Sequence, residues 1–306
     1  MKKTRRPRRR LWPDFLILLT LAAAGAGIAL RAQHQVPYDW DWKSLVPYLV
    51  RTEPALAPGL LLQGVAQTLR LSCWGGLIAI VLGAVGGLCR VSHWPYLRAL
   101  SACLIHGIRN IPPLVLVFLG YFFLADQIPL LSHLHSAART ATGTIRGLLE
   151  FAFGPVSQMH ALWSAACILG LMEGAYVAEI VRTGIESIPR GQWDAGSALG
   201  LSQGQILRHV VLPQALRVMV PPLAGQGIST VKDSAIMAVI SIQELTFQGM
   251  QLMATTYRTF EVWTAVAVIY FLLTTVLSSL AQMVEGRLAR GHASMQNRLT
   301  AAEHSR

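Results

Sequence analysis

The sequence predicts an all-α fold, a polytopic membrane bundle of about six transmembrane helices. Of the 306 residues, 53% are hydrophobic and only 13% are charged, whereas an ordinary soluble domain carries about 25% charged residues. The apolar residues gather in long runs, and a run of roughly 20 is enough for a helix to cross a bilayer. Composition and run length therefore favour a protein surrounded by membrane lipid over a soluble one.

The apolar runs give six candidate spans. They cover residues 13–30, 59–88, 99–124, 157–181, 210–245 and 261–284. The fifth is too long for one straight helix. We expect Pro221 and Pro222 to interrupt it, because proline removes a backbone donor and clashes with the preceding turn. Gly225 and Gly227 follow the two prolines, and such a break is tolerated where other helices or a cavity satisfy the freed backbone groups.

Basic residues between the spans set the predicted orientation. With the N-terminus in the cytoplasm, they concentrate in the inside segments, which hold residues 2–10, Arg90, Arg98, Arg182, Arg190, Arg208 and the C-terminal tail. In the first outside loop they are offset by Asp39, Asp41 and Glu53. The positive-inside rule then places both termini in the cytoplasm of a bacterial inner-membrane protein. The same placement accounts for the net charge of +11 without a nucleic acid as partner.

The spans divide the chain into three regions. Residues 1–58 hold a basic cytoplasmic start, a signal-anchor helix and a periplasmic loop, and the later spans favour an uncleaved anchor over a cleaved signal peptide. Residues 59–287 form the transmembrane domain, with a periplasmic insertion at 126–156 that is rich in Ser, His, Thr and Gly. Residues 288–306 form a cytoplasmic tail.

The sequence lacks a motif for hydrolysing ATP. A Walker A loop needs Gly-Lys-Ser/Thr so that the lysine reaches the phosphates. The lysines of the chain are Lys2, Lys3, Lys43 and Lys232. None of them follows a glycine, so we expect no enzyme activity and no cofactor here, and ATP and Mg²⁺ would bind a separate subunit. The four cysteines lack a Cys-x-x-Cys spacing, so no metal site is predicted either.

The longest cytoplasmic loop reads PRGQWDAGSALGLSQGQILRHVVLP at residues 189–213. It predicts a helix, a turn and a second helix. Gly200 suits the left-handed position that ends a helix, and Ser202 and Gln205 have the spacing of a capping box. The Leu212-Pro213 step should then stop the second helix and start the next span. Such a hairpin could be a docking surface for a partner protein. A structured loop that binds no partner would have the same pattern.

This loop resembles the signature of binding-protein-dependent ABC permeases, which reads Glu-Ala-Ala, three residues, Gly, nine residues, Ile, one residue, Leu-Pro. The residues in register here are Asp194, Ala195, Gly196, Gly200, Val210, Leu212 and Pro213. Asp194 replaces the usual Glu and has a shorter reach, while Gly196 replaces the second Ala and lowers helix propensity by up to about 1 kcal/mol. In that family the loop is the coupling helix that docks on the ATPase subunit, and the resemblance implies that role here.

Other segments narrow the resemblance to permeases for polar amino acids. They are residues 64–72, 109–118, 174–195, 212–222 and 231–245. The first span and the insertion are similar to those of the longer branch, which includes glutamate/aspartate and general L-amino-acid importers. The resemblance covers 59–287 and implies a MetI-like type I ABC importer permease with a core of five spans. It also implies three partners: a second permease chain, the same or a sister, an ATP-binding subunit, and a periplasmic amino-acid-binding protein.

A charged residue inside a span marks a candidate substrate path. Glu173 lies near the middle of the fourth span, where a charge costs about 2.5–3.5 kcal/mol on insertion scales and should face a cavity or a partner. Tyr176 shares its side of the helix. Glu173 could contact the ammonium group or a cationic side chain of the substrate, or it could form a structural pair. It would repel the acidic substrates that the branch resemblance suggests.

Arg109 and Asn110 are candidates at the end of the third span's first half, just before two prolines. Prolines there free backbone carbonyls that can line a path. Arg109 either binds a substrate carboxylate by a two-pronged contact or pairs with Glu179. Glu179 and Arg182 are themselves spaced to pair on one helix, and we predict a structural role for them.

Lys232 and Asp233 adjoin the glycine-containing part of the fifth span, where they form either a gate or a helix-break pair. We predict the permease subunit of an ATP-driven importer for polar amino acids. The alternative is a secondary transporter coupled to protons or sodium through Glu173 and Asp233, which would have no use for the coupling loop. A membrane sensor or scaffold without transport is a third class.

Overall fold

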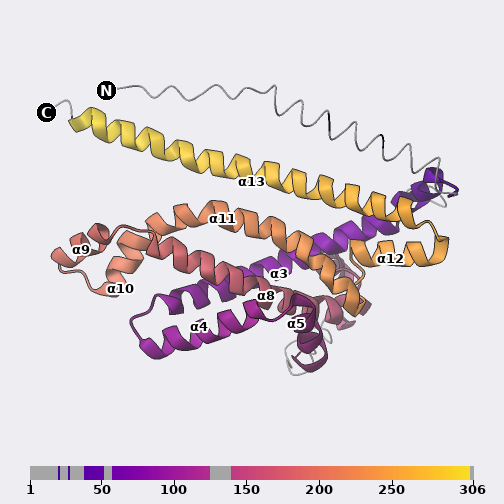
Figure 1. Ribbon diagram of the computed structural model, residues 1–306, viewed down its shortest axis with the longest axis horizontal. Helices are drawn as coiled ribbons and strands as arrows, with labels where there is room; N and C mark the ends of the chain where they lie inside the picture. Colours follow the sequence, from indigo (N-terminus) through magenta and orange to yellow (C-terminus); the bar gives the residue numbers. More distant parts are fainter. Residues whose placement is uncertain (1–19, 21–26, 28–37, 52–56, 125–138, 304–306) are drawn as a thin grey trace. The chain divides into compact units, whose positions relative to one another are not determined.

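The computed structural model describes residues 20, 27, 38–51, 57–124 and 139–303, most of which are helical (Figure 1). Apart from two single residues, the first predicted span lies outside the described residues, as do residues 126–138 of the predicted insertion. The chain divides into two units, residues 1–43 and 44–306. In the first unit the Trp40 ring meets Tyr38 edge-on at 5.0 Å and stacks on Trp42 at 5.9 Å, centroid to centroid.

Short elements lead into the second unit. They are η1 (Trp42–Leu45), α2 (Val46–Leu49), β1 (Val50–Arg51) and β2 (Ala57–Pro58). The two strands pair antiparallel, with Val50 opposite Pro58. Leu45 of this region is buried against Leu61 and Leu245, so these elements close over the start of the first long helix.

Among the described residues, three helices are long and apolar enough to cross a membrane. They are α3 (Leu60–Arg90), α8 (Met159–Glu186), which η4 (Val156–Gln158) extends at its start, and α13 (Thr259–Glu303), whose apolar part is Thr259–Met283. These helices correspond to the second, fourth and sixth predicted spans. Large apolar side chains stay exposed on them, including Val81 at 62% and Phe271 at 68%, as a lipid-facing surface requires.

The third predicted span is broken. It consists of α4 (Pro95–Asn110), α5 (Pro113–Leu119) and the π-helix η2 (Gly120–Leu124), and the chain bends by 108° between α4 and the segment that follows. The span predicted over 99–124 thus consists of helical segments that meet at a sharp bend. Pro112 and Pro113 lack amide hydrogens, and the residue before a proline avoids the helical region, as the extended backbone of Ile111 shows.

The fifth predicted span is continuous where the sequence predicted a break. α11 (Leu212–Asp233) runs without a break through Pro221 and Pro222 and continues as the 3₁₀ helix η6 (Ser234–Ile240). The predicted interruption at the prolines is wrong, because the packing of α11 on α8 and α13 keeps the segment helical despite the missing backbone donors. Figure 1 shows it curved but continuous. α12 (Leu245–Thr256) then leads to α13.

The centre of the second unit is the contact between α3 and α8. A methyl group added at Gly83 would lie 2.4 Å from the Val177 side chain, and one at Gly87 would lie 2.5 Å from Val181. Gly170 of α8 faces Ile78 of α3 in the same way, at 2.5 Å. Small residues let helix backbones approach closely in a membrane, where packing replaces the hydrophobic effect. The glycines therefore allow these two helices to pack in close contact.

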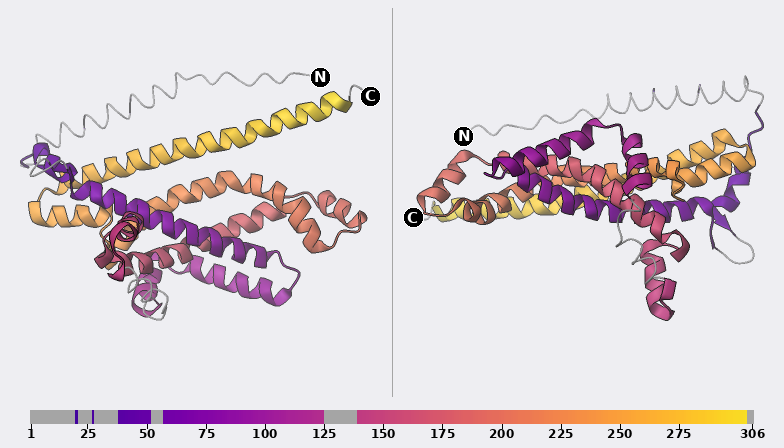
Figure 2. Two further views of the ribbon diagram at one scale, coloured as in Figure 1. Left: turned by 180° about the vertical axis from the view of Figure 1, so that it is seen from behind. Right: turned by 90° about the horizontal axis from the view of Figure 1, so that it is seen from below.

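The described part of the predicted insertion contains α7 (Gly143–Phe153), which projects away from the bundle in the right-hand view of Figure 2. Its end is fixed to α3 by two hydrogen bonds: Trp74 Nε1 donates to the Ala152 carbonyl at 3.0 Å, and Arg70 Nε donates to the Phe151 carbonyl at 2.9 Å. Gly154 follows with φ of 80°, a conformation that favours glycine. The chain thereby turns into α8.

Candidate functional site

The loop 189–213 folds into a hairpin at one end of the bundle in Figure 1. Its elements are α9 (Arg190–Ala198), α10 (Gln203–Ile206) and the π-helix η5 (Leu207–Val211). Gly200 has φ of 76°, so the left-handed turn is confirmed. The capping box is also present, with the Ser202 backbone donating to Gln205 Oε1 at 2.8 Å. We call this unit the α9–α10 hairpin.

The end of the hairpin differs from the prediction. η5 continues directly into α11, and Pro213 lies in the first turn of α11 rather than stopping a helix at Leu212. Proline is tolerated in a first turn because the amide there needs no helical partner. A π turn adds a residue to the winding at this point. The hairpin is therefore joined to α11 without a flexible link.

Ile206 is the core of the α9–α10 hairpin. It is fully buried and packs in one cluster with Ile185, Ile188 and Val211. A methyl group at Gly196 would lie 2.8 Å from Ile206 Cγ1, which gives a packing reason for glycine at this position. The hairpin thus shares its core with the end of α8.

A polar contact also braces the hairpin. Gln214 Nε2 of α11 donates to Gln192 Oε1 of α9 at 3.1 Å. The outer face carries the side chains of Asp194 and Ala195, which are exposed, and Leu199, which is 81% exposed. A large apolar side chain at the tip of a braced, polar hairpin is a surface that a partner can cover.

The second candidate region is a pocket of about 440 Å³ between α5, α8 and α11. Its lining residues are Pro113, Met172, Glu173, Tyr176, Gln226, Ser229, Lys232, Asp233 and Ile236. The structure therefore brings together Glu173, Tyr176, Lys232 and Asp233, which the sequence singled out. We call it the Glu173 pocket.

Of the two residues before the prolines, Arg109 reaches the edge of this region. Its guanidinium carbon lies 5.2 Å from the centre of the Tyr176 ring, a cation–π contact. Asn110 is exposed and is not among the residues that line the pocket. Glu179, the alternative partner of Arg109, accepts hydrogen bonds from Arg182 and lies 3.8 Å from Arg90, and the charge of Arg109 also acts on it. The predicted Glu179–Arg182 pair is confirmed.

Glu173 is the buried acid of the pocket, only 2% exposed. Its Oε2 accepts hydrogen bonds from Gln226 Nε2 at 2.5 Å and from Thr230 Oγ1 at 3.3 Å. The carboxyl group also interacts with the Asp233 side chain. Two acids thus lie together on one wall of the pocket.

Gln226, Ser229 and Thr230 were not singled out from the sequence. The available signal was their spacing: with Asp233 they form a polar stripe on one side of an otherwise apolar helix. The stripe faces Glu173.

A buried network that the sequence did not predict surrounds Glu244, which is fully buried. Its carboxylate caps α12 by accepting from the Phe247 amide at 2.7 Å, and it accepts from the Tyr270 hydroxyl at 2.8 Å and the Thr68 hydroxyl at 3.4 Å. The network joins α3, α12 and α13.

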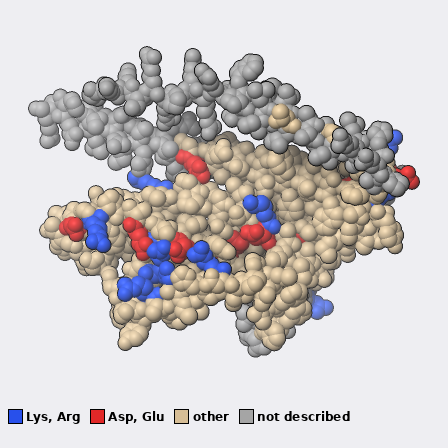
Figure 3. Space-filling model, viewed as in Figure 1, with Lys and Arg blue, Asp and Glu red and all other residues tan. Residues whose placement is uncertain are grey.

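On the surface, acidic and basic side chains lie next to one another within broad uncharged areas, as Figure 3 shows.

Comparison with known proteins identifies the family. The model of the "Binding-protein-dependent transport system inner membrane component" matches residues 48–290. The chain belongs to this family. The permease is 32% identical over 249 residues to the glutamine transport system permease protein GlnP of Escherichia coli K12, covering 81% of this chain and 98% of the relative. It is 29% identical over 250 residues to the glutamate/aspartate import permease protein GltJ of the same strain, covering 82% and 95%.

Solved structures of ABC transporters share the fold of this chain and support the family assignment. An amino acid ABC transporter crystallised with histidines superposes with a TM-score of 0.61 at 28% identity, covering 82% of the permease and all of that chain. The MetNI methionine ABC transporter, at 22% identity, shares the fold with a TM-score of 0.57. The predicted all-α, MetI-like membrane fold is thus confirmed, and with it the membrane location of the permease.

Proposed function

We propose that this permease carries polar amino acids past the Glu173 pocket, driven by an ATPase subunit that docks on the α9–α10 hairpin. The hairpin is the observation that carries the proposal. The signature residues from Asp194 to Pro213 fold into one unit that exposes its outer face and is braced on α8 and α11. A force applied there is passed to two helices that line the pocket.

The chemistry of the pocket suits a free amino acid. Glu173 and Asp233 together can attract an ammonium group, since neighbouring carboxylates favour a positive charge between them. Lys232 lines the same pocket, and Arg109 stands over Tyr176 at its edge, so a carboxylate also has partners. Relatives named for glutamine and for glutamate/aspartate transport support a polar amino acid as the solute.

The proposal includes an orientation and partners. The α9–α10 hairpin and both termini lie in the cytoplasm, where a separate subunit binds ATP and Mg²⁺. A periplasmic amino-acid-binding protein delivers the solute to the opposite end, and a second permease chain, the same or a sister, completes the pore. The hairpin is what an importer driven by ATP needs and an ion-coupled carrier does not.

Reconstitution tests this function. The permease is co-purified with its ATPase, placed in liposomes, and assayed for ATP hydrolysis and uptake with the matching binding protein. We expect polar amino acids to stimulate hydrolysis and vanadate to stop uptake. Uptake that resists vanadate and follows a proton or sodium gradient would instead establish the ion-coupled alternative.

A further inference from the structure

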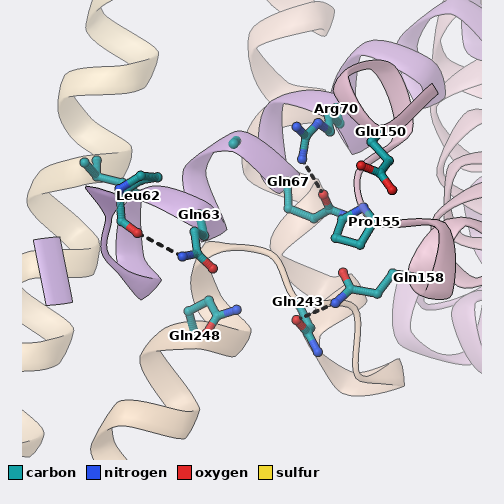
Figure 4. Close-up of a pocket in the computed structure, with 11 residues that line it drawn as sticks. Leu62, Gln63, Gln67, Arg70, Glu150, Pro155, Gln158, Gln243 and Gln248 are labelled. Atoms are coloured by element: carbon teal, nitrogen blue, oxygen red, sulfur yellow. Dashed lines mark hydrogen bonds between the residues drawn. The ribbon is translucent and has the colours of Figure 1, made fainter. Parts of the chain in front are cut away.

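A second pocket, of about 450 Å³, lies at the end of the bundle opposite the α9–α10 hairpin. α8 begins at Met159, directly after the lining residue Gln158, and ends close to the hairpin. Glutamine dominates the lining, with side chains that converge from α3, η4, α12 and the turn before α12 (Figure 4). The glutamines are Gln63, Gln67, Gln158, Gln243 and Gln248. We call it the glutamine pocket.

Hydrogen bonds fix most of these carboxamides. Gln158 Nε2 donates to Gln243 Oε1 at 2.8 Å, and Gln63 Nε2 donates to the Pro58 carbonyl at 2.8 Å. Arg70 Nη1 donates to Gln67 Oε1 at 3.2 Å, while its Nε is held by the Phe151 carbonyl. The walls are therefore set in place before any ligand arrives, which reduces the ordering cost of binding.

Gln248 is the exception and points to a ligand. Its side chain lines the pocket, yet the residue is only 3% exposed. Among the described residues, its Oε1 has no hydrogen-bond partner. A buried acceptor left unpaired is costly, so such groups normally have a partner. Because Oε1 is itself closed off from solvent, the terminal carboxamide has to rotate to present this unfilled acceptor to an N–H donor of a bound molecule.

The charges of the lining narrow the ligand class. Arg70 and Glu150 contribute one positive and one negative group to the lining, and Arg146, outside the lining, donates to Glu150 Oε1 at 3.0 Å. A zwitterion matches that pair, with its carboxylate toward the guanidinium and its ammonium toward the acid. The carboxamides, which both donate and accept, suit a side chain that is polar but uncharged.

We infer that the glutamine pocket is a second binding subsite, which a neutral polar amino acid occupies before it reaches the Glu173 pocket. The inference rests on the proposed function and adds an entry site to it. Gln248 accepts a hydrogen bond from the solute, and Arg70 faces its carboxylate. The Glu244 network holds α12, and with it Gln248, against α3 and α13.

Equilibrium binding of tritiated L-glutamine tests the subsite. The probe is titrated onto the permease–ATPase complex in lipid nanodiscs, without a binding protein. We expect two sites per permease chain. Gln248→Met should weaken one of them about tenfold or more, because a hydrogen bond to a buried group is lost, and Glu173→Gln should affect the other. Gln251→Met, on the same helix but outside the pocket lining, is the matched control and should bind as the wild type.

A second variant keeps the test decisive if Gln248→Met lowers the yield of the complex. Gln63→Met changes an exposed lining residue of α3, beside Gln248 in Figure 4, and should weaken the same site. Wild-type binding in both variants, or a single site per chain, would overturn the subsite even if ATP-driven uptake of L-glutamine is normal. Loss of uptake in the wild-type complex would instead overturn the proposed function.

Discussion

Glu173 combines near-complete burial with donors that come from a single neighbouring helix. Gln226 and Thr230, both on α11, hold one carboxylate oxygen, while the pocket lies beside the same side chain. An acid inside an apolar span costs free energy unless it keeps such partners. The residue therefore ties the position of α11 to the state of the pocket.

Glu173→Gln keeps the shape of the side chain and removes its charge. We expect the uptake rate at low solute concentration to fall about tenfold, since a charged hydrogen bond contributes about 1.5–3 kcal/mol. Co-purification with the ATPase should be unchanged. Glu186→Gln is a control on the same helix, because Glu186 forms an exposed ion pair with Arg182, and such pairs contribute about 0–1 kcal/mol. Unchanged uptake and selectivity in Glu173→Gln would remove it from the path.

Gly196→Ala restores the residue that is usual in the family signature. Here it should destabilise the hairpin by about 1–3 kcal/mol, the usual range for overpacking, because the new methyl group meets Ile206 at 2.8 Å. ATPase binding affinity, measured with the purified permease, should fall accordingly. Gly191→Ala in the same helix has open space around it and is the control. Equal loss in both variants would argue against the packing explanation.

At the scale of elements, glycine and proline residues determine how the helices of the permease are connected and packed. The α9–α10 hairpin turns at Gly200, and α4 ends at Asn110, just before the proline pair. α3 and α8 are joined along their length by glycine contacts. Each junction can be tested by a substitution that changes backbone freedom or spacing and leaves polarity alone.

Gly200→Pro should abolish association with the ATPase. Its φ of 76° cannot be adopted by proline, which requires about −65°, so the two helices of the hairpin would separate. Membrane insertion, followed by fractionation, should be normal because the spans are untouched. Gly204→Ala, at an open position of α10, should form the complex as the wild type does. A normal yield of complex from Gly200→Pro would count heavily against the role of the hairpin.

Gly83→Ala should loosen the contact of α3 with α8. The added methyl group would lie 2.4 Å from Val177 and 2.9 Å from the Gly174 carbonyl, so a backbone has to move. We expect a loss of about 1–3 kcal/mol, seen as a lower melting temperature in detergent. Gly76→Ala, on the same helix with nothing within 4 Å, should melt as the wild type does. If both variants melt alike, close packing at Gly83 is not what holds the pair.

At the scale of the whole transmembrane unit, two polar centres bind different helices together. The Glu173 pocket joins α5, α8 and α11, and the Glu244 network joins α3, α12 and α13. The first faces a cavity, whereas the second is closed. The proposed transport path therefore involves the first, and we expect the second mainly to stabilise the fold.

Tyr270→Phe tests the closed network. It removes the hydroxyl that donates to Glu244 Oε2 at 2.8 Å, and we expect a loss of about 1–3 kcal/mol because a buried carboxylate keeps one donor fewer. Thermal unfolding of the purified complex measures it. Tyr257→Phe is the control, since Tyr257 is 83% exposed. An unchanged melting temperature in Tyr270→Phe would show that the network adds little to stability.

The sequence predicted the features that depend on neighbouring residues, namely the long apolar helices and the capping box. Apolar length gave α3, α8 and α13, and the spacing of Ser202 and Gln205 gave the capping box. The interruption predicted at Pro221 and Pro222 was wrong, whereas the chain does bend at Pro112 and Pro113, because tertiary packing decides whether a helix bends at proline. The partners of Glu173 and Glu244 also escaped prediction, since contacts such as Thr68 with Glu244 join residues far apart in the chain.

The glycine contacts between α3 and α8 have a mechanical consequence. Side chains such as Val177 and Ile78 sit directly against glycines of the partner helix, and such close packing leaves little room to absorb a displacement. The end of α8 shares its core with Ile206 of the hairpin. Gln67 of α3 and Gln158, just before α8, line the glutamine pocket. We therefore expect α3 and α8 to move as one rigid body. A displacement of the α9–α10 hairpin would then also move the glutamine pocket at the opposite end of the bundle.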